Sequence, residues 1–227
     1  YDFWLGPAPK RPFNKNRFHF NFRWFWDYAG GLMTDWGVHL IDYALFGMNQ
    51  YAPLSVMSMG GKFAYPDDAC ETPDTQQTIY DFGDFTLLWD HSIGIDDGYY
   101  GREHGVAFVG YHGTLVVDRG GWEVIPEDHR GKPEIEAVER IEGDGKGLNN
   151  HMNNFINAIR NGDKLNCPVE IAAGVARTCH LGNIAHLTGR RIYWDAEKRE
   201  IIHDDEANKY VVPAYRAPWV LPEIETL

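Results

Sequence analysis

Two polar side chains in the stretch from Gly30 to Gly47 have the types and the spacing needed for acid–base chemistry. Asp35 and His39 are four residues apart, so on a helix the carboxylate and the imidazole lie about 6 Å apart on one face. A histidine can take a proton from a hydroxyl group and return it near neutral pH, and a neighbouring carboxylate holds the ring in place. The spacing also fits a solvated helix face or a satisfied polar pair, so it does not by itself identify a site.

The whole stretch 30–47 is expected to form one helix. Gly30 and Gly31 can turn the chain into it and let its backbone approach a ligand, and Gly47 suits a left-handed cap at its end. Gly37 weakens a helix between the two polar residues, which suggests close approach of another group. The predicted buried stripe has the helical spacing and consists of Leu32, Trp36, Leu40 and Tyr43.

Several neighbouring side chains complete the candidate site. Arg23 could contact a substrate or cofactor, or pack as a cation on an indole ring. His91 falls on one face of a predicted strand, where it could reach the site or simply meet solvent. We expect Asp35 and His39 to be catalytic, and the expected substrate-binding residues are Arg23, Trp26, Asp42 and His91.

Composition restricts the kinds of partner. The chain has 227 residues and a formal net charge of −12, which argues against nucleic acid and anionic membranes and favours neutral or cationic small molecules. No apolar run of eighteen residues and no N-terminal signal pattern occurs, so membrane insertion is not expected, while cytoplasm and periplasm both stay open. Cys70, Cys167 and Cys179 lack C-x-x-C spacing and are interpreted as packing residues. The many aromatic rings could stack on sugars, although core filling explains most of them.

Strand and helix patterns predict an α+β fold. Alternating residues predict strands at 54–63, with a bulge at Gly60–Gly61, and at 75–82 and 85–92 around a Gly83–Asp84 hairpin turn. Short strands follow within 106–126, then a charged connection or exposed ribbon, two helices within 148–189, and a strand at 192–195. The second helix has a stripe of small residues that indicates close packing: Ile171, Val175, Cys179, Gly182 and Ala185.

The expected architecture is a single domain with an open, mainly antiparallel sheet of about six or more strands and helices on one face. Its parts are an irregular lead-in and site wall (1–29), a catalytic helix (30–47), the sheet (54–126), two helices (148–189) and an extended tail (190–227). Pro213, Pro218 and Pro222 keep the tail from forming a helix, so it is expected to wrap the domain or a partner subunit.

The run from Gly30 to Asp42 resembles the G-G-x-x-x-D-x-G-x-H-x-x-D signature of the glucose-fructose oxidoreductase / inositol dehydrogenase (Gfo/Idh/MocA) family. Family-like runs also occur at 4–7, 113–115, 183–185 and 216–219, so the resemblance covers nearly the whole chain. Ala29 stands where the family often has a third glycine. The resemblance implies the second half of a two-domain dehydrogenase, because the glycine fingerprint and the Glu-Lys-Pro lysine of the family's first domain do not occur in this sequence.

The resemblance also implies an activity. The complete parent would move a hydride between a sugar, polyol or related hydroxy compound and NAD or NADP, with His39 as the acid/base and Asp35 orienting it or the hydroxyl. Gly30 and Gly31 would lie at the cofactor, and open sheet faces would join copies into a homo-oligomer. The chain alone is expected to bind no cofactor and to be inactive.

Three alternatives remain open at the level of sequence. The same scaffold also serves redox-neutral glycoside cleavage with tightly held NAD. A metal-dependent sugar isomerase or lyase could use Asp35, His39 and Asp42, or His91, as ligands, although no metal is expected. A non-catalytic module for sugar binding or assembly is the third.

Overall fold

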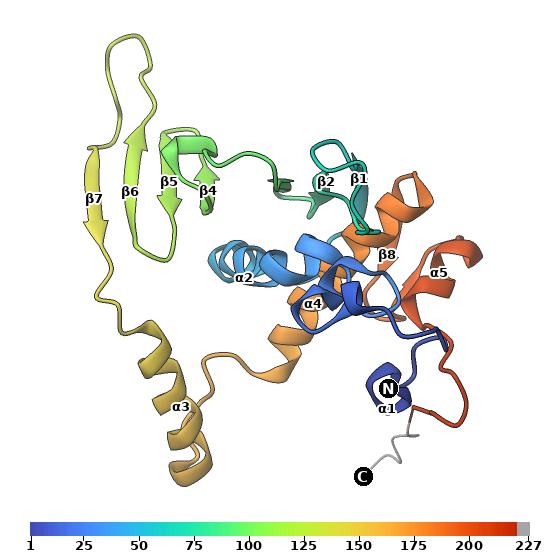
Figure 1. Cartoon of the computed structure of the whole chain (residues 1–227). Helices are drawn as coiled ribbons and strands as arrows, with labels where there is room; N and C mark the ends of the chain where they lie inside the picture. Colours follow the sequence, from blue (N-terminus) through green and yellow to red (C-terminus); the bar gives the residue numbers. More distant parts are fainter. Residues whose placement is uncertain (222–227) are drawn as a thin grey trace. The chain divides into compact units, whose positions relative to one another are not determined.

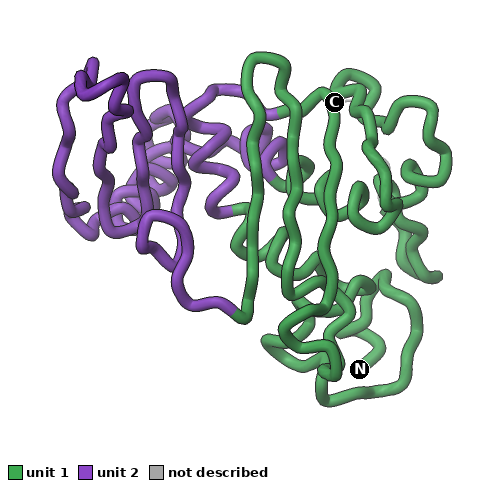
Figure 2. Tube along the Cα trace, turned by 90° about the horizontal axis from the view of Figure 1, so that it is seen from above, with its two compact units in different colours: residues 1–38, 52–94, 176–227 green, residues 39–51, 95–175 purple. Residues whose placement is uncertain are grey.

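The computed structural model describes residues 1–221, which divide into two compact units coloured separately in Figure 2. Unit 1 comprises Tyr1–Val38, Ala52–Gly94 and Ala176–Leu227, and unit 2 comprises His39–Tyr51 and Ile95–Val175. That the whole chain is one domain stays a prediction. Among the described residues, no helix combines the length and the apolar character needed to cross a membrane.

Unit 1 contains a five-stranded antiparallel sheet in the order β3-β2-β1-β8-β9. Its strands are β1 (Ser55–Gly61), β2 (Thr75–Asp81), β3 (Thr86–Ser92), β8 (Ile192–Asp195) and β9 (Glu200–Ile201). The predicted hairpin turn is confirmed, because Phe82 N–H donates to Phe85 O at 3.0 Å and Gly83 has a φ of +86°. The short β9 was not predicted.

The predicted bulge at Gly60–Gly61 is wrong. Both glycines stay in register with β2, opposite Gln76 and Thr75. A Cβ on Gly60 would overlap the carbonyl oxygen of Thr75, so this glycine allows a close backbone approach within a regular ladder.

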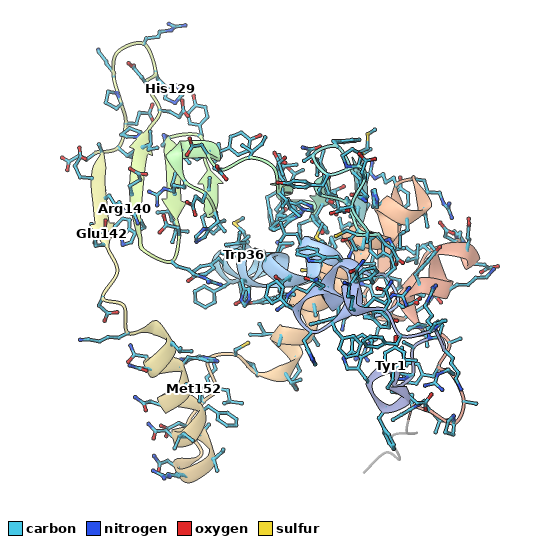
Figure 3. All side chains as sticks on the ribbon, viewed as in Figure 1. Tyr1, Trp36, His129, Arg140, Glu142 and Met152 are labelled. Atoms are coloured by element: carbon cyan, nitrogen blue, oxygen red, sulfur yellow. The ribbon has the colours of Figure 1, made fainter. Side chains whose placement is uncertain are left out.

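Unit 2 contains a separate four-stranded antiparallel sheet in the order β4-β5-β6-β7. Its strands are β4 (Val106–Val109), β5 (Gly113–Val117), β6 (Gly121–Pro126) and β7 (Val138–Glu142). The expectation of one continuous sheet is therefore wrong, because no ladder within residues 1–221 joins β3 to β4. Strand β7 was not predicted, because its sequence is charged. Its Arg140 forms an ion pair with Glu142 of the same strand, both labelled in Figure 3, and another with Asp118, the residue after β5.

Helix α2 (Gly31–Met48) forms where it was predicted, but its buried stripe lies one residue further along. Met33, Gly37, Ile41 and Leu45 are buried, whereas Leu32, Trp36 and Leu40 are half-buried and Tyr43 is exposed. Both stripes are apolar and have helical spacing, so periodicity could not choose between them. Contacts with β2 favour the second stripe: the hydroxyl of buried Tyr80 lies 3.4 Å from Met33 Sδ.

The end of α2 also differs from the prediction. Gly47 is inside the helix, and Asn49 is the residue that adopts the left-handed conformation, with a φ of +51°. Asparagine tolerates that conformation better than most residues, so it can end the helix in place of glycine. A Cβ on Gly47 would lie 2.6 Å from the Phe108 ring, so packing explains this glycine.

The two later helices match the predictions. Helix α4 (Val169–Thr188) buries Val175, Cys179, Gly182 and Ala185 of the small-residue stripe, and Gly189 follows it with a φ of +65°. Helix α3 (Gly147–Asn161) ends at Gly162 in the left-handed conformation. Figure 1 labels this helix. Its large apolar side chains, including Met152, which Figure 3 labels, are exposed.

The lead-in is more ordered than expected. It contains a short helix α1 (Asp2–Leu5) and two 3-10 turns, η1 (Lys15–Arg17) and η2 (Phe20–Trp24). A third 3-10 turn, η3 (Tyr99–Gly101), lies in the connection between β3 and β4.

The tail contains an unpredicted helix α5 (Asp205–Val211). Asp204 caps its first turn, because Asp204 Oδ1 accepts a hydrogen bond from Ala207 N–H at 3.0 Å. Beyond it, Arg216 donates to the carbonyls of Gly6 and Ala8, so the tail does return to its own domain. Pro222 lies outside the described residues.

Candidate active site at the start of helix α2

A tight turn at Gly30–Gly31 leads the chain into α2. Gly31 has a φ of +63°, which favours glycine, and Gly30 N–H donates to Thr34 Oγ1 at 3.0 Å. Asn183 of α4 donates from Nδ2 to Gly30 O at 2.8 Å. The turn is thus held from both the helix it begins and the helix behind it.

Neighbouring side chains explain why both positions are glycine. A Cβ on Gly30 would overlap Asn183 Nδ2, and a Cβ on Gly31 would lie 2.7 Å from Thr72 Oγ1. Gly30 and Gly31 thus closely approach Thr72 and Asn183 of the same chain, whereas the predicted approach to a ligand is untested. Whether a cofactor also reaches these glycines stays a prediction.

Sequence reasoning missed Thr72 and Asn183. They are 2% and 4% exposed, and Thr72 Oγ1 and Asn183 Oδ1 have no hydrogen-bond partner among residues 1–221. The signals for Asn183 were the family-like run at 183–185 and a polar residue between the apolar neighbours Leu181 and Ile184.

Asp35 and Arg23, two predicted site residues, form an ion pair with 2.8 Å between Nε and Oδ1. The guanidinium is also fixed by a hydrogen bond to Phe20 O at 2.7 Å and lies 4.0 Å from the centroid of the Phe20 ring. Arg23 therefore packs on phenylalanine. With side chains 23% and 32% exposed, the pair is still open to a ligand.

His39 lies one turn beyond Asp35 on the same continuous helix, and it is exposed. Asp42 follows it at i+3 and is half-buried. Burial raises the pKa of the Asp42 carboxyl, while the nearby imidazoles of His39 and His151 act in the opposite direction. An accessible imidazole with a carboxylate on each side along the helix can exchange protons with a bound hydroxyl group.

Trp26 lies in the predicted site wall (1–29), and its polar atoms form hydrogen bonds within this chain. Its backbone N–H donates to Glu71 Oε2 at 3.0 Å, and its indole N–H donates to Glu71 O at 3.1 Å. Glu71 N–H in turn donates to Trp24 O at 2.8 Å. What the indole can still offer a substrate is its ring face.

His91 points into the covered face of the unit 1 sheet, so the solvent-exposed alternative is wrong. It is 6% exposed, Trp89 Nε1 donates to its Nδ1 at 2.9 Å, and its Nε2 lies 3.4 Å from Pro73 O. Burial lowers the pKa of His91, which favours the neutral ring. Its role in substrate binding stays a prediction.

The described residues do not fit a dinucleotide or a metal ion by themselves. Every strand ladder within 1–221 is antiparallel, whereas the dinucleotide fold needs parallel strands around a glycine-rich turn. Over the same residues, no group of three or more His, Cys, Asp or Glu side chains is arranged to hold a metal. Among these residues, no set of metal ligands supports the alternative of a metal-dependent isomerase or lyase.

Comparisons with known proteins place this geometry in context. The chain matches the family model described as the oxidoreductase family, C-terminal alpha/beta domain, over residues 1–133 and 129–221. None of the curated proteins compared is similar enough to count as a relative.

Three solved structures illustrate the similarity in fold. A levoglucosan dehydrogenase in complex with NADH is 14% identical with a TM-score of 0.56, covering 74% of this chain and 51% of that chain. An NAD-binding protein from Listeria innocua is 19% identical with a TM-score of 0.53, covering 74% and 52%. An oxidoreductase from Agrobacterium radiobacter in complex with NAD+, L-tartaric acid and magnesium is 12% identical with a TM-score of 0.53, covering 72% and 49%. The chain thus spans about half the length of these structures.

Proposed function

The chain belongs to the Gfo/Idh/MocA oxidoreductase family as its C-terminal alpha/beta domain, and we propose that it is the substrate-binding half of an NAD(P)-dependent enzyme. Its substrate class would be a sugar, polyol or related hydroxy compound. The observation that carries the proposal is the helix that presents exposed His39 one turn after Asp35, with the Asp35 carboxylate held by Arg23. Structures of the same fold that are described as an NAD-binding protein or as complexes with NAD+ or NADH support the type of reaction.

The chain's own contribution is proton transfer and orientation. A nicotinamide, when bound to the complete protein, supplies the hydride chemistry. As the substrate hydroxyl becomes a carbonyl, His39 takes its proton, and in the reverse direction it returns the proton. Asp35 accepts a hydrogen bond from the hydroxyl or from the imidazole, and Arg23 fixes where that carboxylate stands.

The direct test replaces His39 in the full-length protein. His39→Ala should lower turnover by about a hundredfold or more, because the proton would lose its positioned acceptor. His112→Ala is a matched control, since His112 is exposed in the loop between β4 and β5. Turnover that is unchanged in His39→Ala would remove this residue from the mechanism.

We also propose that copies of the chain associate through the outer face of the unit 1 sheet. Met57, Ile79 and Leu88 stand opposite one another on β1, β2 and β3 and are 47%, 45% and 60% exposed. An apolar row of this kind across three strands is typical of an interaction surface.

A further inference from the structure

The lead-in segment carries positive charge in a strongly acidic chain. From Phe3 to Trp26 it contains Lys10, Arg11, Lys15, Arg17 and Arg23 but no Asp or Glu, although the whole chain has a net charge of −12. A local excess of cations produces a positive potential even when the total charge is negative. The expectation of neutral or cationic ligands, which rested on total charge, therefore need not hold here.

Within residues 1–221, two of these five cations have carboxylate partners and three do not. Arg11 pairs with Asp27, and Arg23 pairs with Asp35. Lys15 and Arg17 have no ion-pair partner within residues 1–221.

Lys15 and Arg17 line one shallow hollow, together with Pro12, Phe13 and Asn14, whereas Lys10, the third unpaired cation, does not line it. Arg17 is half-buried and held in place, because its Nη1 lies 3.4 Å from Pro12 O and its Cζ lies 5.7 Å from the Phe25 ring centroid. A guanidinium that is already ordered loses less entropy when it binds an anion.

Phe25 links this hollow to a second one. The second hollow is lined by Asn16, Asn21, Trp24 and Phe25, with Ala69 and Cys70 completing it. Amide side chains beside aromatic rings suit a sugar ring, since the amides bond hydroxyls and the rings cover its apolar face. Trp24 directly follows Arg23, which pairs with Asp35 of the proposed catalytic helix.

We propose that the two hollows bind an anionic sugar, with Lys15 and Arg17 holding its carboxylate, phosphate or sulfate group and Asn16, Asn21 and Trp24 holding its ring. The sugar part of this inference rests on the proposed function, and the anion part rests on the hollow itself. A long polyanion fits less well, because the acidic remainder of the chain would repel it beyond the hollow.

Calorimetric titration of the chain at low salt tests this proposal, with glucuronate, glucose 6-phosphate and glucose 6-sulfate as anionic probes and glucose as the neutral probe. At least one anionic probe should bind saturably and more tightly than glucose, and added salt should weaken that binding. Arg17→Gln and Lys15→Gln should each weaken it by about fivefold or more, because each removes a charged donor. Lys10→Gln should leave it unchanged, since Lys10 is exposed in the same segment but lines neither hollow.

The proposal would be overturned if no anionic probe bound saturably, or if glucose bound as tightly as the anionic probes. It would also be overturned if Lys10→Gln weakened anion binding as much as Lys15→Gln and Arg17→Gln do, or if the chain bound heparin and Lys15→Gln did not weaken that binding. Circular dichroism of each variant separates lost binding from lost folding, and exposed Lys15 is the safer position if Arg17→Gln is misfolded. Failure of the proposed function is distinguishable, because His39→Ala in the full-length protein tests proton transfer and not anion binding. If the full-length protein turned over only neutral sugars and no anionic probe bound, this inference would be wrong while the proposed function would stand.

Discussion

The Asp35 carboxylate is held from outside its own helix. Its partner Arg23 is itself ordered by Phe20, both through the carbonyl and through the ring, so a chain of contacts fixes the carboxylate before any ligand arrives. Preorganised groups of this kind are what acid–base catalysis requires, since reorganisation during the reaction would raise the barrier. A solvated helix face would not need this series of contacts, so the ion pair favours the functional interpretation of Asp35.

Asp74 is a second ordered carboxylate, and we predict that it stabilises the fold in a pH-dependent way. It is 5% exposed and accepts from the N–H groups of Phe63, Ala64 and Tyr65 at 2.8–3.0 Å and from the Thr75 hydroxyl at 2.8 Å. Burial alone would raise the pKa of Asp74, but these hydrogen bonds outweigh it and lower the pKa below 3.8. Asp74→Asn should therefore reduce the free energy of unfolding by about 2 kcal/mol at pH 7, measured by urea denaturation.

The sign of the pH effect follows from the lowered pKa. A group whose pKa falls on folding stabilises the protein fully above its unfolded pKa and loses that contribution as pH falls through the folded value. The difference between wild type and Asp74→Asn should thus be constant near neutrality and shrink below about pH 4. Asp67→Asn, an exposed change in the same loop, should stay within about 0.5 kcal/mol throughout. A difference for Asp74→Asn that does not change with pH would contradict this account.

At the scale of elements, the sequence predicted those helices and strands whose residue pattern distinguishes buried from exposed positions. It did not predict elements whose pattern is ambiguous. The hairpin at Gly83–Asp84, helix α4 with its small stripe and the glycine end of α3 all have local signals in the sequence. The buried face of α2 depended on which apolar stripe met Tyr80, a contact 47 residues away that periodicity cannot see. Strand β7 and helix α5 are charged and mostly exposed, so hydrophobic patterning gave them no weight.

The site shows the same division. Asp35, His39 and Arg23 could be selected by residue type and spacing. Thr72 and Asn183 could not, because their role at Gly30–Gly31 depends on how the segment before β2 and helix α4 pack against the turn.

Two glycines on the facing helices α2 and α4 give a matched test of this packing. A Cβ on Gly182 would overlap the Tyr80 hydroxyl and lie 2.8 Å from Met33 Cε, whereas a Cβ on Gly37 would lie 3.6 Å from Met33 Sδ and Cys179 Sγ. Gly182→Ala should destabilise the protein by about 1–3 kcal/mol through overpacking. Gly37→Ala meets only ordinary contacts and should stabilise it by up to about 1 kcal/mol, because alanine favours a helix interior.

Thermal and urea unfolding of both variants measures the pair. A stabilised Gly182→Ala would show that α4 can move away from Tyr80. Destabilisation by Gly37→Ala would restore the interpretation that this position needs glycine for close approach.

At the scale of the whole molecule, the exposed row on the unit 1 sheet predicts self-association. Light scattering at micromolar concentration should give a dimer or a larger assembly, and Ile79→Lys should shift it toward the monomer, because a charge in the middle of the row opposes burial. Val212→Lys provides the control, since Val212 is 72% exposed beyond α5 and off the sheet. A monomeric wild type would count against association through this face.

The last prediction concerns the cofactor. Dinucleotide binding requires a strand, a glycine-rich turn whose amides meet the pyrophosphate, and a helix, repeated around parallel strands. The ladders of residues 1–221 are all antiparallel, and the Gly30–Gly31 turn is filled by Thr72 and Asn183, so neither feature offers a pyrophosphate its place. Hydride transfer also needs both reactants within about 3–3.5 Å, which one wall of a site cannot ensure. We therefore expect the isolated chain to fold but to give no saturable heat when titrated with NAD or NADP, and to turn over no sugar. A micromolar dissociation constant for either nucleotide would place a cofactor site on this chain and would require the roles of Gly30 and Gly31 to be assigned again.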